Sequence, residues 1–308
     1  MMRQVLLWAS ENAWARRRLP RYGFVRRAVS RFMPGEDLEA ALGAARELNG
    51  TGLGAVLTLL GENVVDEADT AAVVGHYLEL MEAIRERRLD AEVSLKLTHL
   101  GLDLDPALAR ANLLRTATRA AELGQDLAVD MEGSAYTQRT LDLYREVRAT
   151  HANVALCLQS YLRRTANDLE ALVPLRPKIR LVKGAYAEPA AIAYPSKAEV
   201  DRAFLQQAQR LMRAALPGEG PRVILGTHDR RLIAELIAWA TRESIPPSAY
   251  EFHLLYGIAR DEQQRLKAGG HRVRVLVSYG TAWFPWYMRR LAERPANVWF
   301  VARSLFTR

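Results

Sequence analysis

The sequence predicts a single (βα)8 TIM-like barrel of the α/β class, distorted, with extra N-terminal helices. Three observations support this prediction. Eight short runs of apolar and β-branched residues follow one another, longer amphipathic segments separate them, and neither a GxGxxG nor a Walker lysine motif follows any of the runs. Eight such units in 308 residues fit a closed barrel better than an open doubly wound sheet. We expect residues 1–50 to form an N-terminal helical arm and residues 51–308 to form the barrel with the functional site.

The arm is expected to contain two or three helices, because Pro20 and the segment Met33-Pro34-Gly35 interrupt it. Its first 31 positions are the most basic part of the chain and are interleaved with aromatic residues, which suits a phospholipid headgroup region. Packing of the arm against the barrel is equally open, and nucleic-acid binding is the least favoured of the three because basic residues elsewhere alternate with acids. The residues concerned are Trp8, Trp14, Arg16, Arg17, Arg18, Arg21, Tyr22, Phe24, Arg26, Arg27 and Arg31.

The expected strands are short and bounded by turn residues. They cover residues 52–60, 91–98, 126–132, 153–159, 178–184, 222–228, 250–257 and 272–280. Amphipathic helices are expected between them, including 70–88, 105–124, 203–216 and 229–243, where apolar residues recur at three- and four-residue spacing. Asp105 and Pro106 are typical of a helix start, and Gly124 of a helix end.

The composition is that of an ordinary globular domain, with 49% hydrophobic and 25% charged residues and a formal charge of +8. The single cysteine, Cys157, excludes an intramolecular disulfide framework, and its apolar surroundings predict a small buried side chain. No run of apolar residues approaches the roughly 20 needed to span a bilayer, and the first residues do not resemble a signal peptide. We therefore expect a cytoplasmic protein, with at most peripheral contact at the inner face of the cytoplasmic membrane.

Polar side chains gather where the expected strands end, and the carboxyl-terminal rim is where barrel enzymes build their sites. Several are cations, which suit a carboxylate or phosphate ligand. The six histidines show no metal-ligand spacing, and no GxSxG elbow is present, so no metal is predicted. Taken singly, each residue has a structural alternative, such as helix capping by Asp229. The late-strand residues are Lys96, Asp130, Glu132, Gln159, Lys183, Thr227, His228, Asp229, His253 and Tyr256, and further cations are Arg180, Arg289 and Arg290.

The segment KIRLVKGAYAEP, residues 178–189, strongly resembles the proline dehydrogenase family, whose fifth strand carries a similar segment along FAD. Further segments resemble that family in the expected order: SLKLTHLG, DMEGSAY, LQSYLRRT, GTHD, YEFHLLYGI and WYMRRLAERPAN. The resemblance covers roughly residues 50–308 and is closest to the compact monofunctional bacterial members. It implies oxidation of L-proline to 1-pyrroline-5-carboxylate, with FAD as cofactor and a membrane quinone as electron acceptor.

The resemblance also implies roles for individual residues. Arg289 and Arg290, assisted by Lys96, would bind the proline carboxylate, and Glu293 would orient an arginine or face the substrate amine. Asp130 and Arg180 would be catalytic, with Asp130 holding the cations in place and Arg180 stabilising negative charge on the reduced flavin. The remaining cofactor contacts would come from Met131, Gln159, Val182, Lys183, Gly184, Ala185, Thr227 and His228, with a weaker assignment of Lys197 to the adenosine part.

Two positions differ from the family pattern. A tyrosine is common on the eighth strand where this chain has Leu276, and Tyr279, three residues later, is expected to face the other side of the strand. Trp286 replaces another common tyrosine. Both positions wall the substrate pocket in relatives, so preference between proline and hydroxyproline depends on them.

Other functions are compatible with the same residues. A Schiff-base aldolase could use Lys183 or Lys96, and a flavin-dependent folate reductase is the nearest redox alternative. A non-catalytic membrane or nucleic-acid binder that uses the basic arm is the alternative from another class.

Overall fold

The computed structural model describes residues 29–293 except 63 and 216–219, together with Trp8, Asn12, Trp14, Arg18 and Tyr22. For residues 289, 290, 292 and 293 it describes the backbone alone. Of the basic and aromatic residues singled out in the predicted arm, Arg16, Arg17, Arg21, Phe24, Arg26 and Arg27 lie outside the described residues.

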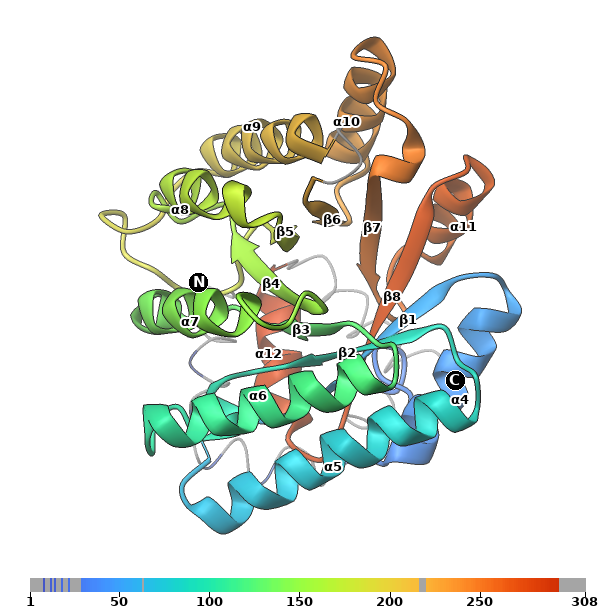
Figure 1. Cartoon of the computed structure of the whole chain (residues 1–308). Helices are drawn as coiled ribbons and strands as arrows, with labels where there is room; N and C mark the ends of the chain where they lie inside the picture. Colours follow the sequence, from blue (N-terminus) through green and yellow to red (C-terminus); the bar gives the residue numbers. More distant parts are fainter. Residues whose placement is uncertain are drawn as a thin grey trace.

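Eight parallel strands close into a barrel in sequence order, from β1 to β8 and back to β1 (Figure 1). The predicted fold class is therefore confirmed. The strands are β1 Gly54–Leu59, β2 Ala91–Leu95, β3 Leu127–Val129, β4 Val154–Gln159, β5 Lys178–Val182, β6 Arg222–Gly226, β7 Tyr250–Leu255 and β8 Arg272–Tyr279. Most of them end earlier than predicted, because the last polar residues of each predicted run leave the sheet and enter the following loop.

Helices follow the strands and surround the barrel (Figure 1). They are α4 Leu38–Gly50, α5 Glu67–Glu86, α6 Pro106–Glu122, α7 Ser134–Arg148, α8 Thr165–Leu172, α9 Lys197–Ala215, α10 Arg230–Arg242, α11 Arg260–Ala268 and α12 Trp283–Glu293. Three-residue 3₁₀ helices are η2 Thr98–Leu100, η3 Val173–Leu175 and η4 Pro247–Ala249. The start predicted for α6 is correct, since Asp105 accepts a hydrogen bond from the Ala107 amide. None of the described helices has the combination of length and apolar character that a bilayer crossing requires.

The main hydrophobic core lies between the barrel wall and the surrounding helices. Helix α4, from the predicted arm, contributes Ala41, Leu42 and Ala45 to it. A second cluster joins α12 to the segment that precedes α4 and includes Phe32, Trp283 and other apolar residues. Trp283 also donates a hydrogen bond from Nε1 to Glu36 Oε1 (2.9 Å), so residues 29–36 hold the start of α12.

The interior of the barrel changes character from one mouth to the other. Because side chains alternate along each strand and neighbouring strands are staggered, alternate strands supply successive layers. By the strand register, one lower layer contains Asp126, Lys178 and Glu251, and the layer above it contains Glu92 and Arg274. The next layer contains Val56, Ala128, Arg180 and His253. Above it the register gives Ser94, Cys157, Gly226 and Leu276, and then Thr58, Asp130, Val182 and Leu255. Three of the four residues in the layer directly above Arg180, Ser94, Cys157 and Gly226, are therefore small.

Candidate active site

Arg180 on β5 is the centre of the polar cluster inside the barrel. Its side chain is only 3% exposed, and it forms an ion pair with Asp130, which follows β3. Burial disfavours the guanidinium charge, but Asp130, Cys157 and Glu92 together outweigh that effect, so the pKa of Arg180 is raised. Its Nη2 also donates to Ser94 Oγ (2.9 Å), and Ser94 Oγ donates to Asp130 Oδ1 (3.0 Å). Ser94, Asp130 and Arg180 thus hold one another in a fixed arrangement.

One donor of this cluster has no partner within the described part of the chain. Arg180 Nη1 is buried and makes no hydrogen bond there. Ser278 Oγ, on β8 near the same mouth, is also buried without a hydrogen bond to any described residue. Because buried donors are normally satisfied, such groups are suited to a ligand that enters the barrel mouth.

Lys96 completes the charges around Asp130. It directly follows β2, its side chain is 11% exposed, and its Nζ lies 3.9 Å from Asp130 Oδ2. The cluster of Lys96, Asp130 and Arg180 carries one positive charge in excess, in a poorly solvated position. An anionic group is therefore the ligand that it favours.

Gln159, at the end of β4, joins two of the loops that follow the strands. Its Nε2 donates to the Glu132 carbonyl (2.9 Å), and its Oε1 accepts from the Ala185 amide (3.2 Å). Met131 is buried beside this connection, and the Val182 carbonyl accepts from the Ser160 amide (2.8 Å). These bonds fix the loop after β3 relative to the loop after β5.

Gly184 is required by the local backbone. Its φ of +129° is strained for other residues, and a Cβ built on it would lie 2.2 Å from the Tyr161 ring. The chain after β5 therefore passes against the Tyr161 ring, in a close approach that only glycine permits.

A second charged cluster lies at the start of α10. Lys183 Nζ bonds Asp201 Oδ1 (2.6 Å) and Asp229 Oδ2 (3.0 Å), and both carboxylates also bind Lys197. Arg231 Nη2 lies 2.7 Å from Asp201 Oδ2. Although burial opposes it, Lys183 and Lys197 hold the pKa of Asp229 well below its ordinary value. The Asp229 side chain makes no capping bond to α10, because the lysines occupy it instead.

Thr227 and His228 shape the same rim. Thr227 Oγ1 accepts from the Asp229 amide (3.2 Å), and His228 Nε2 accepts from the Leu255 amide at the end of β7 (2.8 Å). His228 therefore connects the loop after β6 to β7.

His253 lies deeper in the barrel, where burial lowers its pKa. Tyr256 follows β7, and its amide donates to the Leu276 carbonyl (2.9 Å).

Glu132 is buried beneath the turn that follows β2. Its carboxylate accepts from the Thr98 amide (3.2 Å) and the Thr98 hydroxyl (2.6 Å). Burial raises the pKa of Glu132 to about 7, although Thr98 and Lys96 oppose that rise. The sequence singled out Glu132 as a late-strand residue but gave it no role.

The structure brings together the predicted residues in two groups. Lys96, Asp130 and Arg180 form one, and Lys183 and Lys197 belong to the other. Arg289, Arg290 and Glu293 lie on the backbone of α12, but their side chains are outside the described part of the chain. Ser94 and Asp201 were missed, although Ser94 is two residues before Lys96 and Asp201 is four after Lys197, spacings that share a strand face and a helix face.

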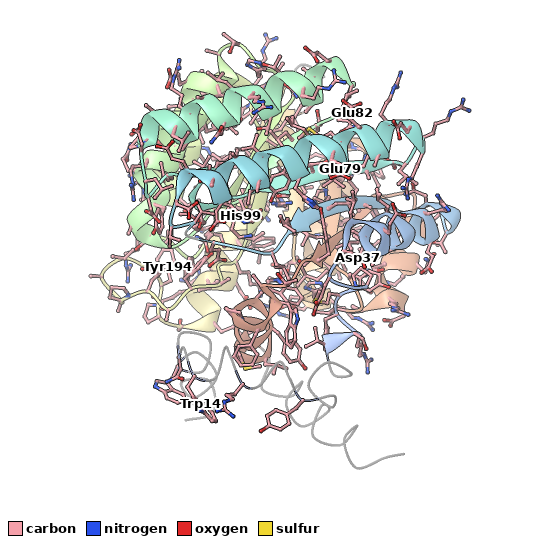
Figure 2. All side chains as sticks on the ribbon, turned by 90° about the horizontal axis from the view of Figure 1, so that it is seen from below. Trp14, Asp37, Glu79, Glu82, His99 and Tyr194 are labelled. Atoms are coloured by element: carbon pink, nitrogen blue, oxygen red, sulfur yellow. The ribbon has the colours of Figure 1, made fainter. Side chains whose placement is uncertain are left out.

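The two positions that depart from the family pattern are also described. Leu276 belongs to a layer of the barrel interior by its register with Val56 and Leu255. Tyr279 faces the helices instead, because its hydroxyl lies 2.8 Å from His76 Nε2 on α5. Trp286 is half-buried against the cluster that joins α12 to residues 29–33. His99, on η2, packs edge-on against Tyr77 of α5 and lies near that helix in Figure 2.

The amino-terminal mouth of the barrel is also charged and opens into a depression of about 870 Å³. Its buried charges are paired with each other: Arg222 binds Glu92 (2.6 Å), Asp126 (2.5 Å) and Glu251, and Arg274 binds Glu92 (3.0 Å). Since barrel enzymes react at the opposite mouth, we assign this network to stability. Across the described residues, no group of His, Cys, Asp and Glu side chains is arranged to hold a metal ion.

The chain is similar in sequence to known proteins. Residues 41–303 match the family model described as proline dehydrogenase. The chain is 37% identical over 305 residues to proline dehydrogenase 1 of Bacillus subtilis, with 99% of both chains covered. It is 37% identical over 284 residues to proline dehydrogenase of Deinococcus radiodurans, covering 90% of this chain and 89% of that one.

A solved structure supports the fold. Proline utilization A from Bdellovibrio bacteriovorus, inactivated by N-propargylglycine, superimposes with a TM-score of 0.79 at 21% identity. The match covers 87% of this chain and 32% of that chain. Together with the family model and the relatives, the comparison leads to one assignment: the chain belongs to the proline dehydrogenase family and is an oxidoreductase.

Proposed function

We propose that this protein oxidises L-proline to 1-pyrroline-5-carboxylate with bound FAD, as the first step of proline catabolism. The observation that carries the proposal is the buried Arg180, paired with Asp130 and with Nη1 free of any described partner, at the reactive mouth of a proline dehydrogenase family barrel. In the reaction a hydride leaves the ring carbon next to nitrogen, and the nitrogen loses a proton, so that a C=N bond forms.

The residues at the carboxyl-terminal mouth fit FAD. Arg180 would donate to the isoalloxazine ring and stabilise negative charge on it, while Gln159 and the backbone near Met131 and Val182 would bond its edge. When bound, FAD supplies the hydride acceptor. In this assignment Arg180 changes the flavin's electronic properties, and Asp130 keeps Arg180 in position.

The dinucleotide part would follow the loop after β5 toward α10. Gly184 allows close backbone approach beside Ala185, and Lys183 with Lys197 supplies cations next to a helix N-terminus, which suits a pyrophosphate. Thr227 and His228 would lie against it. Asp201 and Asp229 hold these lysines in place.

The substrate carboxylate would bind Lys96 together with Arg289 and Arg290. The excess positive charge around Asp130 favours such an anion, and fixing it would orient the proline ring for transfer of its hydride. Glu293, one turn after the arginine pair on α12, would orient an arginine or face the amine. Leu276 and Trp286 would contribute to the preference between proline and hydroxyproline.

A spectrum of the purified protein tests the assignment. We expect flavin absorbance that bleaches when L-proline is added without oxygen, with 1-pyrroline-5-carboxylate as the product. A colourless protein that borohydride traps on Lys183 or Lys96 would indicate an aldolase instead. Bleaching that requires a folate in place of proline would indicate the reductase.

Electrons would pass from the reduced flavin to a membrane quinone, with the N-terminal arm in peripheral contact with the bilayer. Trp8, Trp14 and Tyr22 support this, since they are 60%, 65% and 52% exposed and suit an interfacial region. Figure 2 shows Trp14 at the lower edge of the molecule.

Replacing Trp8 and Trp14 by Ala should weaken sedimentation with anionic vesicles severalfold. The control is Leu104→Ala, which removes an exposed apolar residue (38% exposed) between η2 and α6 and should leave sedimentation unchanged. Equal sedimentation of the double variant and the original protein would refute membrane contact through these tryptophans.

A further inference from the structure

The turn after β2 carries Lys96 and is anchored from β3 by one carboxylate. Lys96 belongs to this turn, because its carbonyl accepts from the His99 amide (3.2 Å). Main-chain pairing of β2 with β3 continues to the bond between the Asp130 amide and the Leu95 carbonyl (2.8 Å). Beyond that bond, both oxygens of Glu132 bind Thr98, two residues after Lys96. Glu132 therefore extends the connection between the two strands past the end of their ladder.

This anchor is a buried side chain rather than a surface contact. Glu132 is 3% exposed and Thr98 is fully buried. The loop is fixed from behind as well, since Gln159 donates to the Glu132 carbonyl (2.9 Å). Because both the side chain and the main-chain carbonyl of Glu132 are hydrogen-bonded, this residue has little freedom to move, and it therefore fixes the position of the turn.

Lys96 is one of the charged groups that affect the ionisation of Glu132. Lys96 on the β2 turn favours the ionised carboxylate, Glu62 from the loop after β1 disfavours it, and Thr98 donates two hydrogen bonds to it. The same Lys96 has its ammonium 3.9 Å from Asp130. Lys96 therefore interacts electrostatically with two carboxylates, Asp130 in the proposed substrate site and Glu132, which is bonded to the turn.

We infer that Glu132 is a positioning residue, which fixes the turn after β2 so that the Lys96 ammonium stays at the substrate carboxylate. The inference rests on the proposed function, because it assumes that Lys96 binds that carboxylate. Glu132 itself is outside the reacting groups, so it acts through Lys96.

Steady-state kinetics of the FAD-bound enzyme test the inference. Glu132→Gln keeps the size of the side chain but loses its charge and one acceptor, so KM for proline should rise about tenfold while kcat changes less than about threefold. Thr98→Val removes one hydroxyl donor and should raise KM about threefold, which probes the same contact if the buried glutamine prevents folding. The matched control is Glu262→Gln, a carboxylate with 2% exposure that binds Arg265 on α11, which should leave KM unchanged.

The pH profile adds a signature that a purely structural role would lack. Because the ionised form of Glu132 makes the contacts described above, kcat/KM of the unmodified enzyme should include a rise with pH centred near the pKa of about 7. That rise should be missing in Glu132→Gln. A profile identical in both proteins would contradict the inference.

A double-mutant cycle separates this inference from the proposed function. If Glu132 acts through Lys96, Glu132→Gln should change KM less than about twofold in a Lys96→Met background. An equal factor in both backgrounds overturns the inference alone, as does an unchanged KM in Glu132→Gln when Lys96→Met raises it. An unchanged KM in Lys96→Met removes Lys96 from the substrate site, so the proposed function of that residue and this inference fail together.

Discussion

At the scale of single residues, the site depends on charges that are buried together. Asp130 accepts a hydrogen bond from Ser94 and lies beside both Arg180 and Lys96, so the two cations share one carboxylate. For Glu132, burial disfavours the ionised carboxylate and raises its pKa. Since its folded pKa of about 7 lies above the ordinary 4.5, it contributes stability below pH 4.5 that is lost as the pH rises through 7. The ionised form that holds Thr98 is thus the form that destabilises the fold.

Replacement of Arg180 by Met tests the central ion pair. The variant leaves Asp130 and Ser94 without their guanidinium partner, so we expect kcat/KM for proline to fall about a hundredfold. The free energy of unfolding should fall by about 3 kcal/mol, because a buried charge loses its partner. Flavin-linked turnover and denaturant unfolding measure the two effects.

Two further variants control that experiment. Arg180→Lys keeps the positive charge and should recover part of the activity, whereas Arg110→Met removes an arginine whose side chain is 47% exposed and should change neither quantity. Turnover of Arg180→Met at the original rate would exclude Arg180 from catalysis.

At the scale of elements, the loops after the strands are held by side chains from neighbouring units. Glu188, after β5, accepts bonds from the Ser134 amide (2.7 Å) and hydroxyl (2.5 Å), and so caps α7 from outside that helix. The residue before α7 is Gly133, which has no side chain with which to cap it. The loops after β3 and β5, which are the proposed cofactor loops, therefore depend on each other.

Gly184→Ala tests how closely the loop after β5 must pack. An added Cβ meets the Tyr161 ring and an unfavourable φ, so we expect a loss of about 2 kcal/mol in unfolding free energy and severalfold less FAD in the purified protein. Flavin absorbance per chain and denaturant titration measure these changes.

The matched control is Gly75→Ala within α5, where no atom lies within 4 Å of the added Cβ. That variant should be stabilised by about 0.5–1 kcal/mol. Normal flavin content in Gly184→Ala would show that the loop has more room than its geometry indicates.

At the scale of the whole molecule, the two mouths of the barrel have different roles: the carboxyl-terminal mouth carries the candidate site, and the amino-terminal mouth is assigned to stability. At the carboxyl-terminal mouth, Lys96, Asp130 and Arg180 leave one positive charge in excess, whereas at the amino-terminal mouth Arg222 and Arg274 neutralise buried carboxylates. By the strand register, the layer that contains Arg274 and Glu92 lies between Arg222 and Arg180. We therefore expect stability and reactivity to respond to different substitutions.

Arg222→Met should show that separation. The change leaves Glu92, Asp126 and Glu251 without a shared cation, so the unfolding free energy should fall by about 3 kcal/mol. KM and kcat for proline should be unchanged at a temperature where the variant is folded. Arg272→Met, at an exposed position of the same mouth, should cost less than about 0.5 kcal/mol. A large change in KM without loss of stability would mean that the two mouths are coupled.

The sequence by itself determined the order of the eight strands, the closed barrel and the rim on which the polar residues lie. These follow from local patterns, because strand ends and helix caps such as Asp105 depend on near neighbours. Strand ends were predicted too long, since Asp130 and Glu132 have no local signal that separates strand from loop. Only the tertiary structure decided that Ser94 joins Arg180 to Asp130, that Glu132 holds Thr98, and that Asp201 binds Lys183. Such contacts join strands, loops and a helix that lie far apart in sequence, and the residue pattern of a single element does not contain their relative placement in the barrel.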